Sequence, residues 1–194
     1  MIEGITEGRE TMRIVPNVGP EAMARVRRAQ ALNDDIDWTV DDEDERRALA
    51  MWRPLARAYP EDLAILHGYV LALARVAGEE RTVALAGEYR QAAMRLLAKD
   101  PVRRDAAAFA ASATARWAAI VGDAAAWQEA LGLHELEFAR STSDAERAYA
   151  LHDQAWVLCA LGRREEATAK TDAALALDPR TAHMRFDHRH EWDR

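Results

Sequence analysis

A pattern of histidines that could bind a metal ion lies near the C-terminus of this 194-residue chain. From Met184 onward, apolar or aromatic residues alternate with charged ones, so His188 and His190 would share one face of an extended segment. Two imidazoles on one face can bind a transition metal when a further ligand such as His183 joins them. A frayed or capping tail, or an extended segment docked on the protein, explains the same alternation, and we expect no metal or cofactor.

Motifs for catalysis are missing from the sequence. It holds no phosphate-binding loop, no nucleophile elbow and no His-Glu-x-x-His zinc helix. Cys159 follows His152 by seven residues and sits in an apolar run, where a thiol usually serves as a small buried hydrophobe. A single cysteine cannot form an internal disulfide, which favours a reducing compartment. We therefore expect a cytoplasmic protein that is not an enzyme.

The charge of the chain is concentrated in one segment. Eight acids and no base lie between Asp34 and Glu45, against a formal net charge of −7 for the whole chain, so the remainder carries about +1. A nucleic-acid binder would need a basic stripe to neutralise phosphates. The acidic run lacks the glycine and ligand spacing of a calcium loop, and its second half suits the start of a helix. No uncharged apolar run is long enough to span a membrane. We expect neither nucleic acid nor membrane as a partner.

The composition favours an all-α protein. Alanine is abundant, while glycine (9) and proline (6) are scarce. The basic residues are nearly all arginine, which suggests a GC-rich bacterial genome. Hydrophobic periodicity and capping residues predict a flexible leader at 1–19, a helical domain at 20–181 and an extended or capping tail at 182–194. The predicted helices are 21–32, 43–58, 63–77, 82–99, 104–121, 124–140, 145–161 and 164–177.

The helix breaks recur along the chain. Helix pairs end at intervals of about 40 residues, and a glycine divides each pair near its middle. The pairs end at Pro60, Pro101, Ser141 and Pro179, and the dividing glycines are Gly78, Gly122 and Gly162. Such a period predicts an α-solenoid, in which each antiparallel hairpin buries its apolar face against its neighbours. A plain bundle of eight helices is the alternative.

The last period carries a family resemblance. Residues 148–181 contain Gly162, Ala167, Ala174 and Pro179 at spacings that resemble a tetratricopeptide repeat. In physical terms, the glycine turns the chain, the alanines allow close helix approach, and the proline ends the hairpin. Earlier periods match less completely, and Trp127 stands where a small residue is usual. The resemblance implies a right-handed superhelix of antiparallel helix hairpins.

The resemblance also implies a binding groove. In this family the first helix of each pair lines a concave groove that holds a partner peptide. The implied groove residues are His67, Leu71, Arg75, Phe109, Ser112, Arg116, Tyr149, His152 and Trp156. The last three also share one helical stripe by their spacing, which places Leu151, Ala155 and Leu158 on the core side.

The chemistry of these groove positions favours a protein or peptide partner. Aromatic rings and arginines suit a peptide with an apolar or aromatic anchor and a carboxylate. We therefore expect a non-enzymatic protein–protein interaction module. Three alternatives remain open at this point. The groove side chains could simply pack against the neighbouring hairpin, the groove and tail could form a homodimer, or the C-terminal histidines could make a small metal-binding protein.

Overall fold

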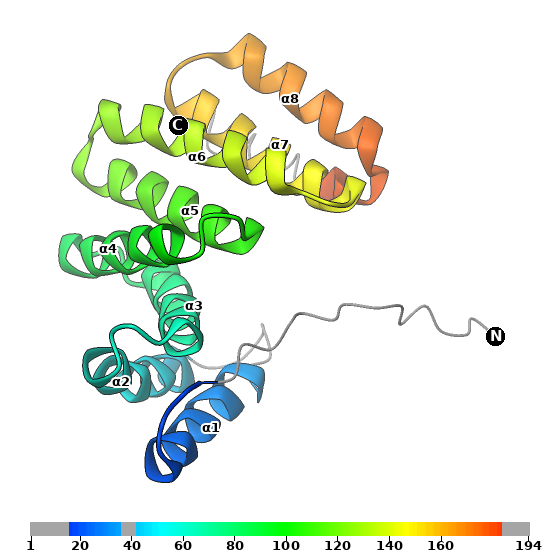
Figure 1. Cartoon of the computed structure of the whole chain (residues 1–194). Coiled ribbons are helices and arrows are strands. Elements are labelled where there is room, and N and C mark those ends of the chain that lie inside the picture. The colour runs from blue at the N-terminus through cyan, green and yellow to red at the C-terminus, as the bar shows by residue number, and fades with distance from the viewer. Residues whose placement is uncertain (1–15, 36–41, 184–194) are drawn as a thin grey trace.

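The computed structural model describes residues 16–35 and 42–183, and these form an all-α array. Eight α-helices pack in chain order as antiparallel neighbours, from α1 at one end of the curved stack to α8 at the other (Figure 1). They are Pro20–Asp35 (α1), Asp42–Ala58 (α2), Leu63–Glu79 (α3), Val83–Lys99 (α4), Arg104–Val121 (α5), Ala124–Arg140 (α6), Asp144–Ala160 (α7) and Arg164–Leu177 (α8). A short 3₁₀ helix, η1 (Pro179–His183), follows. The predicted all-α hairpin array is confirmed.

Local capping residues fix the helix ends in the second half of the chain. Gly122 and Gly162 adopt φ values of 71° and 74°, in the left-handed region that glycine enters without steric cost. The Asp123 carboxylate caps α6 by accepting from the backbone amides of Ala125 and Ala126, at 2.9 and 3.1 Å. Ser143 begins α7 with a complete capping box. The turns within α5–α6 and α7–α8 therefore lie at the predicted glycines.

The predicted break at Gly78 is wrong. Helix α3 continues through Gly78 to Glu79, and the Glu80 amide still donates to the Val76 carbonyl at 2.9 Å. The chain turns at the next three residues instead, where the Thr82 hydroxyl caps α4 by accepting from the Leu85 amide at 3.3 Å. A glycine with an ordinary helical φ costs some stability but does not end a helix, and the capping threonine decides where the next helix begins.

The core runs along the array instead of gathering at one centre. A large cluster joins α1 to α5 around Trp52, Leu73 and Tyr89, and a smaller one joins α5 to α8 around Leu131 and Leu158. Helix α5 presents fully buried alanines to both sides, so its neighbours approach it closely: these are Ala106, Ala107, Ala110, Ala111, Ala113, Ala115 and Ala118. The predicted core stripe of α7, Leu151, Ala155 and Leu158, is buried.

Packing between next-nearest helices differs along the stack. Helix α3 contacts both α1 and α5 directly, so no gap separates these odd-numbered helices in the first half of the array. In the described residues no packing of comparable extent joins α5 to α7. Among the odd-numbered helices, α5 and α7 are therefore the neighbouring pair that does not pack directly, and the cleft described below lies between them.

Parts of the predicted leader and tail lie within the described residues. In the leader, residues 16–19 are non-helical, and the Asn17 amide donates to the Asp62 carboxylate at 2.8 Å. The rest of the leader lies outside the described residues. The side chain of His183, the last residue of η1, also lies outside the described part of the chain. His188 and His190 lie outside it entirely, so the structure does not describe the metal site that these histidines could form. None of the helices in the described ranges combines the length and the apolar character needed to cross a membrane.

Candidate functional site: the cleft between α5 and α7

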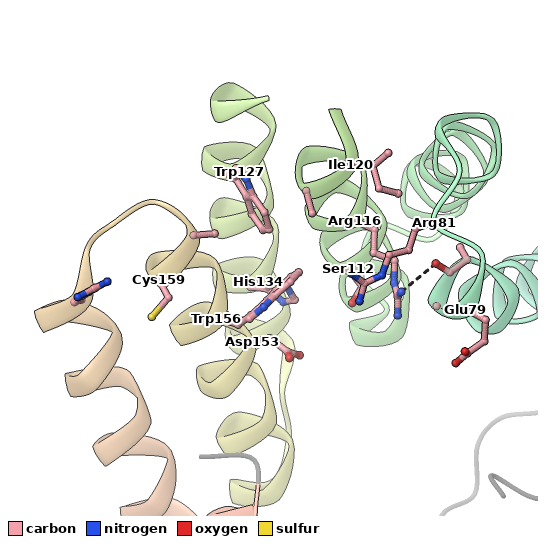
Figure 2. A pocket seen from close by; sticks show the side chains of 15 residues that line it. Glu79, Arg81, Ser112, Arg116, Ile120, Trp127, His134, Asp153, Trp156 and Cys159 are labelled. Carbon is pink, nitrogen blue, oxygen red and sulfur yellow. Dashed lines mark hydrogen bonds between the residues drawn. The ribbon is translucent and has the colours of Figure 1, made fainter. Parts of the chain in front are cut away.

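A cleft of about 770 Å³ opens where α5 and α7 fail to meet (Figure 2). Helix α5 forms one wall, helices α6 and α7 form the other, and the end of α3 and the turn after it close one side. The side chains that matter chemically are Glu79, Arg81, Ser112, Arg116, Trp127, His134, Asp153, Trp156, Cys159 and Arg164. The cleft therefore combines aromatic, acidic and basic groups.

A tryptophan stands at this junction where two other hairpins have an alanine. Trp127 is the fourth residue of α6, and the fourth residues of α4 and α8 are Ala86 and Ala167, which are buried. Trp127 instead meets Trp156 of α7 edge to face, with ring centroids 5.2 Å apart and an interplanar angle of 75°. We attribute the separation of α5 from α7 to this indole, because it occupies space into which a methyl group would let the helices close.

The floor of the cleft is built on a buried charge network in α6. His134 and Glu137 are each 1% exposed, and the His134 Nδ1 lies 2.9 Å from a Glu137 carboxylate oxygen. Arg104 of α5 donates to the other Glu137 oxygen at 2.8 Å. The Gln154 side-chain amide of α7 donates to the His134 carbonyl at 3.1 Å. A buried carboxylate is costly unless it is paired, so this network satisfies Glu137 and fixes the imidazole in place.

Asp153 of α7 lies beside this network and faces the cleft (Figure 2). Within the described ranges no basic side chain forms an ion pair with it. Burial against the surrounding protein is the dominant effect, and it raises the pKa of Asp153 from its ordinary 3.8 to about 6. The nearby charge of Glu137 adds to this rise, whereas His134 and Arg104 partly offset it. The Asp153 side chain is only partly buried, so protein covers most of it while one side remains open to the cleft.

These acidic groups and the imidazole are of types that can ligate a metal. One ring nitrogen of His134 and one carboxylate oxygen each from Glu137 and Asp153 lie within 4.8 Å of one another. Both Glu137 oxygens already accept hydrogen bonds, one from Arg104 and one from the imidazole. A ligand that used Glu137 would therefore share its oxygens with Arg104 and His134, whereas the Asp153 carboxylate has no such ion pair among the described residues.

The rim of the cleft carries charges of both signs. Arg116 of α5 donates to the Ala77 carbonyl at 3.1 Å and so ties α5 to the end of α3 (Figure 2). Arg81 and Arg164 line the cleft from exposed positions. The exposed acid Glu79 lines the same rim, and the carboxylate of Asp153 lies at the floor.

Three of the sequence-predicted groove residues come together in this cleft. Ser112 and Arg116 lie on the α5 wall and Trp156 lies on the α7 wall, as the repeat register predicts. Cys159, one turn beyond Trp156, also lines the cleft and is only partly buried, which differs from the expectation of a buried hydrophobe.

The other predicted groove residues lie elsewhere. His152 is fully buried, and its Nε2 lies 3.0 Å from the Thr181 hydroxyl, so the structure places it in the core between α7 and η1. Tyr149 is 41% exposed but does not line the cleft. His67 packs edge to face on Phe109, with ring centroids 5.6 Å apart, and burial lowers its pKa.

Leu71 and Arg75 on α3 are partly buried and also lie outside the cleft. One physical reason explains why these two residues, and also His67 and Phe109, lie outside the cleft. Helices α3 and α5 pack directly, so no cleft remains open between their groove-facing positions.

Sequence reasoning missed the floor of the cleft. His134 and Glu137 are three residues apart in a predicted helix, which is a weak signal for a paired interaction. Asp153 is the one acid among residues 148–160 of a predicted helix, and an acid in that stretch is the signal that could have marked it. Nothing local predicts that Asp153 lies beside His134, because that contact depends on how α7 packs on α6.

Comparison with known proteins gives no further assignment. No protein-family model matches this chain, and no curated protein matches it either. The helical-hairpin array is therefore assigned from the structure and not from a family.

Proposed function

We propose that this chain is a non-enzymatic, cytoplasmic binding module, similar to a tetratricopeptide-repeat domain, that holds a peptide segment of a partner protein. The observation that carries the proposal is the cleft between α5 and α7. Trp156, Ser112 and Arg116, which the repeat register assigns to one concave surface, line it from two different helices. The helical-hairpin array supports the resemblance at the level of architecture.

The chemistry of the cleft favours a peptide over a small polar metabolite. Trp127 and Trp156 are half-buried and offer the aromatic surface on which binding hot spots are usually built. Arg81 and Arg164 at the rim suit a carboxylate of the partner, since guanidinium groups bind carboxylates through paired hydrogen bonds. A volume of about 770 Å³ accommodates a few side chains and not a folded domain.

A selection from a phage-displayed library of linear peptides tests this proposal. Selected peptides are synthesised and titrated by calorimetry against the wild-type protein and the Trp156→Ala variant. Truncating a central aromatic hot spot costs about 2 kcal/mol or more, so we expect affinity to fall at least about 30-fold. Tyr149→Ala is the matched control, because it removes an exposed aromatic ring from the same helix outside the cleft.

Two outcomes contradict the proposal. One is a selection that yields no binding peptide. The other is a set of peptides whose affinity falls equally for Trp156→Ala and Tyr149→Ala, which would place the binding surface outside the cleft. Circular dichroism of both variants serves as the control for folding, because a variant that has lost its helices would also lose binding.

A further inference from the structure

We infer that the floor of the cleft is a subsite for a basic side chain, lysine or arginine, of the bound peptide. This inference rests on the proposed function and adds the chemistry of one residue that the cleft recognises. It depends on the Asp153 carboxylate and the Trp156 indole on the same face of α7, with the Trp127 ring packed against that indole.

The helices bring these groups to one place. Asp153 and Trp156 are three residues apart on α7 and therefore share a face of that helix. Trp127 contacts Trp156 across the α6–α7 boundary. Figure 2 shows Asp153, Trp156 and His134 gathered at the same wall of the cleft. A carboxylate beside aromatic faces is the arrangement that binds ammonium and guanidinium groups, through ion pairing and cation–π attraction.

The charge balance of the floor favours a cation from outside. Arg104 is engaged by Glu137 at 2.8 Å and by Asp105 at 3.1 Å. Glu137 is therefore compensated, whereas Asp153 has no ion-pair partner in the part of the chain that the structure describes. A partly buried carboxylate without a counter-charge is unfavourable, and a ligand cation would remove that cost.

An organic cation fits this floor better than a metal ion does. Catalytic and structural zinc sites use three or four protein ligands. Here the three candidate ligands include Glu137, and a metal bound to it would compete with the hydrogen bonds that Arg104 and His134 make to both of its oxygens. The tryptophans have no role in binding a metal but do offer π faces to an ammonium or guanidinium group.

The test uses a positional-scanning peptide library on the wild-type protein and on Asp153→Asn, which keeps the size of the side chain and removes its charge. We expect lysine or arginine to be selected at one position. Replacing that residue by norleucine should weaken binding at least tenfold in the wild type and less than twofold in Asp153→Asn. Glu135→Gln is the matched control, since Glu135 is an exposed acid on α6 that does not line the cleft.

The outcomes separate this inference from the proposed function. Peptides that bind without a basic preference, or whose preference persists in Asp153→Asn, overturn the subsite and leave the peptide-binding function standing. A library that yields no binder overturns the proposed function.

A second measurement tests the floor without any peptide. Butylguanidinium chloride should shift the indole N–H NMR signals of Trp127 and Trp156 in the wild type and not in Asp153→Asn. No shift in the wild type overturns the subsite. A zinc chloride titration with 1:1 stoichiometry that Asp153→Asn abolishes would also overturn it, by assigning the floor to a metal ion.

Discussion

Replacing Asp153 by asparagine should stabilise the folded protein near neutral pH while it damages the cleft. The carboxylate lies against a largely dry wall, next to the carboxylate of Glu137 and without an ion-pair partner among the described residues. Asparagine has nearly the same size and carries no charge, so the variant no longer pays the free-energy cost of burying a negative charge. Water in the cleft can still satisfy its polar atoms, because the side chain faces the open space.

The size of the effect follows from the raised pKa of Asp153. Burial raises it from 3.8 to about 6, and each pKa unit corresponds to about 1.4 kcal/mol. The full difference would be about 3 kcal/mol, and remaining contact with solvent reduces it, so we expect about 1–3 kcal/mol. The folded chain holds this proton more tightly than the unfolded chain does. The penalty is therefore absent below pH 3.8, grows as the pH rises through about 6, and is complete above it.

Urea unfolding followed by circular dichroism measures this effect at pH 4 and at pH 7.5. The free energy of unfolding of Asp153→Asn should exceed that of the wild type by about 1–3 kcal/mol at pH 7.5, and the difference should shrink toward zero at pH 4. Glu135→Gln, in which an exposed acid is changed, should show no such difference. A variant less stable than the wild type at pH 7.5, or a difference independent of pH, would refute the argument.

Three further predictions concern the packing that shapes the array, and each is measured as a change in the free energy of urea unfolding. Gly68→Ala should cost about 1–3 kcal/mol, because the new methyl group would overlap the buried ring of Trp52; Gly132→Ala, with no neighbour within 4 Å, should instead gain up to about 1 kcal/mol. Ala167→Leu should cost about 1–3 kcal/mol by overpacking a fully buried position, and an unchanged midpoint would mean that the α7–α8 hairpin is loosely packed. Glu137→Ala should cost about 3 kcal/mol, since it strips a guanidinium of its buried counter-charge; a loss below 1 kcal/mol would show that the network is solvated.

Local sequence signals predicted the helices well because they act over a few residues. The bounds of α5, α6 and α8 agree with the prediction, since Gly122 and Asp123 sit at the α5–α6 turn and Gly162 at the α7–α8 turn. The predicted break at Gly78 was wrong because glycine alone does not end a helix. Helix α3 ends instead at the polar turn that follows Gly78, where Thr82 caps α4.

The candidate site was predictable only in part. A helical stripe identifies which residues share a face, and Trp156 of the predicted stripe lines the cleft. The same stripe failed for His152, because η1 folds back on α7 and supplies the Thr181 hydroxyl as its partner. The floor could not be predicted, since Asp153 and His134 meet only through the angle at which α7 crosses α6.

Trp127 has a consequence for how such an array can change over time. The fourth residues of α4 and α8 are alanines, and the corresponding residue of α6 is the indole that lines the cleft between α5 and α7. A hollow can thus be created or erased by exchanging one amino acid, without altering any hairpin's length or turn. Recognition surfaces in this architecture would then be acquired junction by junction, each independent of the rest of the scaffold.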